Sequence, residues 1–100
     1  MMFDNELSSF IDTTILRYSS ENGSPAARYV INLRHYQSRI TDKLVNECLS
    51  ACDRMGLTAE RIGDAVFIDV NLNRCTFSSR QAREYQTAVN YRRTIHGHDL

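Results

Sequence analysis

The sequence predicts a small α+β domain in which antiparallel β-hairpins pack against two amphipathic helices. Within residues 41–72, apolar residues first recur at steps of three and four, and then, after Gly56, at every second position. An apolar content of 42% over 100 residues is enough for one core, so we expect one domain with a loose tail at residues 97–100. A mostly helical fold with one hairpin in the C-terminal half is the alternative.

The first element admits two interpretations. Apolar residues at helical spacing favour a helix, and they are Leu7, Phe10, Ile11, Thr14, Ile15 and Tyr18. Residues 13–18, however, are rich in β-branched side chains, which favour a strand. We expect a short helix that Asp4 caps and that ends near Ile11, followed by a strand over residues 13–18.

Residues 19–24 form a loop by composition, with Asn22 and Gly23 at its centre. Residues 26–36 again fit two structures. In a strand, one face would carry Tyr29, Ile31 and Leu33, and the opposite face would carry Val30, Asn32 and Arg34. A helix opened by Ser24 and Pro25 would run on to give about thirty residues, which is long against a mean near a dozen. We expect the strand, paired in a hairpin with residues 13–18, and keep the helix as its rival.

The central unit is a helix, a glycine stop and a hairpin. Thr41 is placed to cap the helix, and Gly56 follows its last apolar position as a left-handed C-terminal cap requires. The inner face of this helix consists of Leu44, Val45, Cys48, Leu49, Cys52 and Met55. Residues 58–62 form the short first strand, and Gly63-Asp64 suits a tight turn with glycine at its first central position. The second strand buries Val66, Ile68, Val70 and Leu72.

A final helix follows a connection in which Cys75 and Phe77 add apolar anchors. Ser78 or Ser79 caps this helix and Gly97 ends it. Its inner side is expected to hold Ala82, Tyr85, Ala88, Val89 and either Tyr91 or Arg92. Its outer side carries a polar stripe at steps of four and three, formed by Ser79, Arg83, Gln86, Asn90 and Arg93.

The formal net charge is zero, so bulk electrostatics give no strong attraction to nucleic acid or membrane. Eleven of the twelve basic residues are Arg, and two basic stretches, residues 28–40 and 70–98, flank an acidic middle. These stretches form one patch if they meet in space and otherwise pair with the acidic blocks. The acidic N-terminus, the lack of a membrane-spanning apolar run and three Cys without a secretion signal predict a cytoplasmic protein with reduced thiols.

No motif predicts catalysis, a metal or a cofactor. Cys48 and Cys52 lie four residues apart, and a metal site would need ligands such as His35 or His96 with Cys75. The paired spacing of a structural zinc site is missing, so we expect two core cysteines. A His96-Gly97-His98 segment could bind a divalent ion, but three His without a motif carry little weight.

The stripe on the last helix is the sharpest functional candidate. Arg and Tyr are enriched in interface hot spots, and Arg, Gln and Asn also read bases and phosphates. The same pattern is typical of the solvated face of any amphipathic helix. The expected partner-binding residues are Arg83, Gln86, Asn90, Arg93, Arg80, Arg28 and Arg34.

Three functions follow from this pattern. The first is a small non-enzymatic interaction protein that binds, and inhibits or regulates, a larger protein, a role typical of the class of phage and mobile-element accessory proteins. The alternative is a nucleic-acid-binding protein that uses the last helix together with Arg28, Arg34 and Arg39. The third, least favoured by the sequence, is an enzyme that uses His35, His96 or Cys75.

Overall fold

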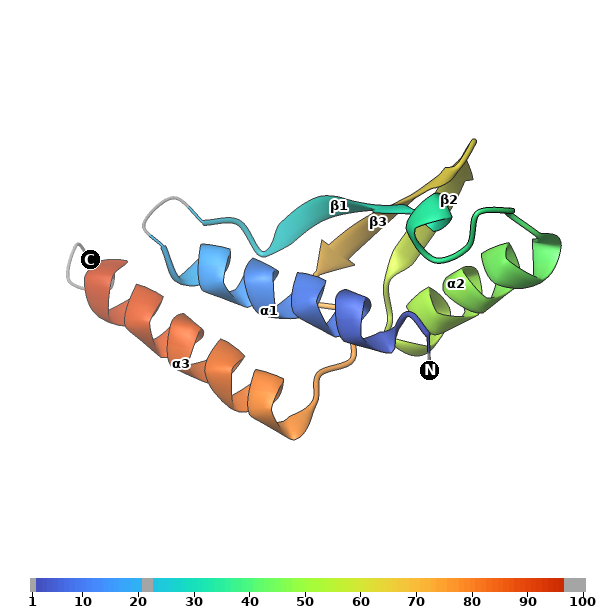
Figure 1. Ribbon diagram of the computed structural model, residues 1–100. Coiled ribbons are helices and arrows are strands. Elements are labelled where there is room, and N and C mark those ends of the chain that lie inside the picture. Colours follow the sequence, from blue (N-terminus) through green and yellow to red (C-terminus); the bar gives the residue numbers. More distant parts are fainter. Residues whose placement is uncertain (1, 21–22, 97–100) are drawn as a thin grey trace.

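The sheet has three antiparallel strands in the order β1-β3-β2, and helices cover one of its faces (Figure 1). The computed structural model describes residues 2–20 and 23–96, so Gly97 and the predicted tail lie outside the described residues. The α+β class predicted from the sequence is confirmed. The elements in chain order are α1 (Asp4–Ser19), β1 (Ala26–Asn32), the 3-10 turn η1 (Leu33–His35), α2 (Asp42–Arg54), β2 (Thr58–Ile62), β3 (Ala65–Asn71) and α3 (Ser79–His96).

The α2–β2–β3 unit has the predicted construction. Thr41 Oγ1 accepts a hydrogen bond of 3.2 Å from Leu44 N, which caps α2. Gly56 has a φ of 69° and ends the helix as predicted. In the hairpin, Gly63 has a φ of 63° and Asp64 has a negative φ, which is the pattern of a turn with glycine at its first central position.

β3 is the central strand and supplies the middle of the core. Because β1 and β2 both run antiparallel to β3, they are parallel to each other, and α2 is the crossover between them. Val66, Ile68 and Val70 are each 0% exposed, as their alternation predicts. They pack with the buried face of α2, formed by Leu44, Val45, Cys48, Ala51 and Cys52.

The two cysteines of α2 are core residues, as predicted. Cys48 and Cys52 are 0% and 1% exposed. Hydrogen bonding to Cys52, together with burial, raises the pKa of the Cys48 thiol. The same hydrogen bond lowers the pKa of the Cys52 thiol.

The prediction for residues 13–18 is wrong, because α1 continues without a break to Ser19. One face of the whole helix is buried, and on it lie Leu7, Ile11, Thr14 and Ile15. The Thr14 hydroxyl donates to the Phe10 carbonyl at 2.7 Å, which satisfies a polar side chain inside the helix. Burial of a continuous stripe thus outweighs the β preference of individual residues. Asp4 is not the cap either, since Phe3 occupies that position without a side-chain bond.

β1 is a strand, as predicted, but its partner is not. The hairpin with residues 13–18 does not form, and β1 pairs instead with β3, with Tyr29 opposite Ile68 and Ile31 opposite Val66. The rival helix over this segment is wrong as well. The predicted faces are correct, since Ile31 and Leu33 are buried, Tyr29 is half-buried, and Val30 is exposed.

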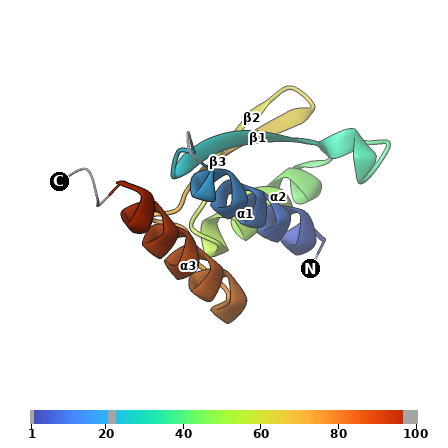
Figure 2. The same ribbon diagram turned by 90° about the vertical axis from the view of Figure 1, so that its left-hand side faces the viewer.

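α1 and α2 lie on the same face of the sheet, and α3 lies on the far side of α1 from the strands (Figures 1 and 2). The other face of the sheet carries no helix within the described residues. Tyr29 connects the sheet to α1, because its ring stacks on Phe10 at 4.6 Å and its hydroxyl bonds Thr14 at 2.9 Å. The fold therefore consists of a sheet, a pair of helices, and one further helix that rests mainly on α1.

A pair of glycine substitutions tests the roles of the two turns. At Gly63 a Cβ would meet nothing within 4 Å, so Gly63→Ala should cost only the strain of a positive φ, about 1–2 kcal/mol. At Gly56 a Cβ would lie 2.8 Å from the backbone oxygen of Arg74, so Gly56→Ala should lose about 1–3 kcal/mol more. Urea unfolding followed by circular dichroism measures both, and equal losses would contradict the close approach at Gly56.

Candidate interaction surface

α3 packs along α1, and the two helices run parallel. Near their starts, Gln81 bonds Ser8 and Asp12, and near their ends the Arg92 guanidinium donates to the carbonyl oxygens of Tyr18 at 3.0 Å and Ser20 at 2.6 Å. Both views show the helices side by side (Figures 1 and 2). The arrangement leaves most of the α3 perimeter in contact with solvent.

Gln81 is the residue that fixes the start of α3, and the sequence interpretation missed it. Ser78 Oγ accepts from Gln81 N at 3.1 Å, and Gln81 Oε1 accepts from Ser78 N at 3.0 Å. This is a capping box, and the spacing of Ser78 and Gln81 is the signal that could have revealed it. The amide of Gln81, only 1% exposed, also donates to Ser8 Oγ at 3.0 Å and to Asp12 Oδ1 at 2.9 Å.

The predicted inner side of α3 is wrong at one position, and the structure decides the alternative left open at another. Ala82 is exposed rather than buried, because Gln81 faces α1 in its place. Tyr91 is 53% exposed, and Arg92 is the inward residue of that pair, with its guanidinium 4.9 Å from the centre of the Tyr18 ring. Ala88 is buried as predicted, and Tyr85 and Val89 are half-buried. The inner face therefore has fewer apolar contacts than the sequence suggested.

The polar stripe of α3 lies half a turn from this inner face. Its four functional candidates are exposed, and they are Arg83, Gln86, Asn90 and Arg93. Neither Arg83 nor Arg93 has an ion-pair partner among the described residues. Gln86 donates to Asn90 at 3.1 Å along the stripe. At a rise of 1.5 Å per residue, the backbone positions of Arg83 and Arg93 lie about 15 Å apart along the helix axis.

The other three predicted partner-binding residues are engaged within the chain. Arg80 makes two 3.0 Å hydrogen bonds to Glu84 and two of 3.1 Å to Asp12, and these bonds raise the pKa of Arg80. Arg28 pairs with Asp69 at 3.1 Å and Arg34 with Asp64 at 2.6 Å.

Arg28 and Arg34 do not join the arginines of α3 in one patch. Arg28 and Arg34 belong to β1 and η1, while α3 lies beyond α1 (Figure 1). Arg28 and Arg34 form their ion pairs with Asp69 and Asp64, which belong to the acidic middle of the chain. For these two arginines the structure shows the second of the two expectations, which was pairing with the acidic blocks.

A groove of about 710 Å³ separates α1 from α3 on one side of the pair. Its apolar floor includes Ile15, Leu16 and Ala88. Leu16 is 72% exposed, more than any other large hydrophobic side chain among the described residues. The remaining lining residues are Asp12, Ser19, Arg80, Arg83, Glu84 and Thr87.

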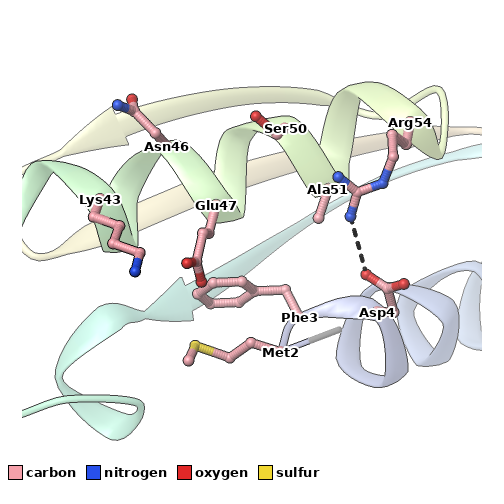
Figure 3. A pocket seen from close by; sticks show the side chains of 9 residues that line it. All are labelled: Met2, Phe3, Asp4, Lys43, Asn46, Glu47, Ser50, Ala51 and Arg54. Atoms are coloured by element: carbon pink, nitrogen blue, oxygen red, sulfur yellow. Dashed lines mark hydrogen bonds and ion pairs between the residues drawn. The ribbon is translucent and has the colours of Figure 1, made fainter.

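A second groove, of about 680 Å³, lies between the start of α1 and α2 (Figure 3). Its floor is Phe3 and Ala51, both 1% exposed, with Met2 beside them. Arg54 and Asp4 close one end with an ion pair of 3.4 Å. Lys43 stands toward the other end of the groove, and Glu47 lies between the two ends. The remaining lining residues are Asn46 and Ser50.

The described residues assemble no group of side chains that could hold a metal ion. No group of three His, Cys, Asp or Glu side chains in residues 2–20 and 23–96 comes close enough to hold a metal ion. His35 is exposed and Cys75 half-buried, and neither lines either groove. The side chain of His96, and His98, lie outside what the structure describes.

Comparisons with known proteins identify no relative. No family model matches the chain, and neither the curated proteins nor the solved structures contain a match. None of the described helices combines the length and apolar character that crossing a bilayer requires. A functional proposal therefore rests on the surface of this chain alone.

Substitution of Gln81 tests how α3 is held. Gln81→Ala removes the capping box and the bonds to Ser8 and Asp12, so we expect a loss of about 1–3 kcal/mol in the free energy of unfolding. Gln86→Ala is the matched control, because Gln86 is exposed on the same helix and should change stability by less than about 0.5 kcal/mol. Urea denaturation measures both variants, and similar small effects would show that Gln81 does not anchor α3.

Proposed function

We propose that this chain is a small non-enzymatic interaction protein that binds a larger protein through the outward stripe of α3. The observation that carries the proposal is the pair of exposed guanidinium groups of Arg83 and Arg93. Ion pairs or carbonyl contacts engage Arg28, Arg34, Arg54, Arg80 and Arg92 within the described chain. The stripe arginines have no such partner there. Arg17, Arg39 and Arg74 also lack one, but they lie on separate segments, whereas Arg83 and Arg93 share one helix face. An exposed, uncommitted Arg can form bidentate bonds with carboxylates.

The position of the stripe supports the same proposal. α3 contacts the rest of the domain mainly through α1, so its outer face is clear of the sheet and of α2. Gln86 and Asn90 add amide donors and acceptors between the two arginines. Four of the five charged residues of α3 are Arg, and this composition favours a partner with acidic residues.

Nucleic acid is the competing partner, and the structure offers it less than the sequence suggested. Arg28 and Arg34 carry ion pairs on the other side of α1, so they do not extend the stripe. Among the predicted nucleic-acid contacts, only those of the last helix then lie together, whereas nucleic-acid binding usually draws on several phosphate contacts.

The experiment is affinity capture by the tagged protein from a lysate of its native cells, with and without nuclease. We expect a protein partner that survives nuclease treatment and is lost from the double variant Arg83→Glu and Arg93→Glu. Both residues are exposed and unpaired in the described chain, so the variant should keep its circular dichroism spectrum and its unfolding midpoint.

The matched control reverses two other exposed arginines, Arg39→Glu and Arg74→Glu, which changes the net charge equally on different surfaces. This control should retain the partner. Capture that nuclease abolishes would favour nucleic acid, and equal loss of the partner in both double variants would show that net charge, not the stripe, determines binding.

A further inference from the structure

The groove between α1 and α3 exposes apolar side chains on both of its walls. Leu16 is 72% exposed on α1. Tyr91 follows Thr87 by one helical turn, so it continues the α3 wall beyond the end of the groove, and it is 53% exposed. Two of the largest exposed hydrophobic side chains thus project on the same side of the helix pair. Solvent-exposed apolar groups gathered in this way mark interaction sites.

We propose that this groove is an interface between two copies of the chain, in which two α1–α3 pairs meet face to face as a four-helix arrangement. The proposal goes beyond the proposed function, because it concerns another partner and the groove side of the α1–α3 pair, which shares only Arg83 with the stripe. In a twofold interface the same patch appears on both sides, so the patch must be complementary to itself.

The charges that line the groove satisfy this requirement. Asp12 and Glu84 balance Arg80 and Arg83, so the groove has no net charge and an identical copy meets no net repulsion. Arg80 already bonds both carboxylates. A strongly acidic or basic partner would gain little here, whereas a second neutral groove fits.

The distribution of these charges along the groove points to an antiparallel twofold pairing. All four charged residues lie toward the starts of the lining segments, while Ser19 and Tyr91 form the uncharged far end. A twofold axis across the helices, near Leu16, places the charged end of each copy opposite the uncharged end of the other. Leu16 of one copy then faces Leu16 of the other at the centre of the interface.

The size of the helix pair is sufficient for such an interface. α1 has 16 residues and α3 has 18, so the pair extends about 24 Å at 1.5 Å per residue and is about 20 Å wide. Its flat area is on the order of 500 Å² per copy, or about 1,000 Å² for two, which is in the range of weak, transient protein interfaces. A weak, concentration-dependent dimer is therefore expected.

Sedimentation velocity over a range of concentrations tests the proposal on the full chain. The mass should rise from the 11.5 kDa of the chain towards twice that value as the concentration increases. Leu16→Arg should remain a monomer at every concentration. Arg is as good a helix former as Leu and position 16 is exposed, so the variant should keep its circular dichroism spectrum.

Val30→Arg is the matched control, because Val30 is 52% exposed on the bare face of the sheet and the change in charge is the same. This variant should associate like the natural chain. A natural chain that stays monomeric throughout, or Leu16→Arg that associates unchanged, would overturn the proposal. Loss of association in Val30→Arg alone would assign the interface to the sheet and would overturn it as well.

Discussion

Burial of the inward row of β3 is the interaction on which the rest of the structure depends. Val66, Ile68 and Val70 lie between the two outer strands and beneath α1 and α2, and each is fully buried. At about 1.5–3 kcal/mol per buried side chain, this row contributes more than any polar contact in the chain. It also sets the direction of the neighbouring elements. The chain reverses its direction at Gly56, between α2 and β2, and again at Gly63, between β2 and β3. These two reversals bring β3 to the centre of the sheet.

α3 is held by a different kind of interaction. Its buried apolar contribution is small, chiefly Ala88 with parts of Tyr85 and Val89, while Gln81 and Arg92 provide most of its specific contacts with α1. Hydrogen bonds of this kind contribute about 1 kcal/mol each, less than a fully buried aliphatic side chain. The apolar core of the domain therefore receives only a small contribution from α3. Substitutions on the outer surface of α3 can therefore change its binding properties with little effect on the stability of the fold.

The success of sequence interpretation followed the range of the interactions involved. The α2–β2–β3 unit was predicted in detail because its cap, its glycines and its change of period are all local. The partner of β1 was missed because β3 lies about forty residues away along the chain, and no local pattern records such a pairing. Gln81 was missed because a polar residue at a buried position is recognisable only when Ser8 and Asp12 are seen beside it. The stripe was found because exposure repeats with the helical period.

Most of the stripe lies about a third of a turn from the groove wall on α3, since Gln86 and Asn90 face away from the groove, whereas Arg83 belongs to both surfaces. Two copies joined through the groove would consequently leave Gln86, Asn90 and Arg93 of each stripe free, with Arg83 at the edge of the interface. A partner with two acidic sites could then bind both, and the second contact would form at the high effective concentration that the first provides. This matters because two arginines on a short stripe offer only modest affinity by themselves. Pairing through α1 and α3 would thus strengthen binding without adding a single residue to either stripe.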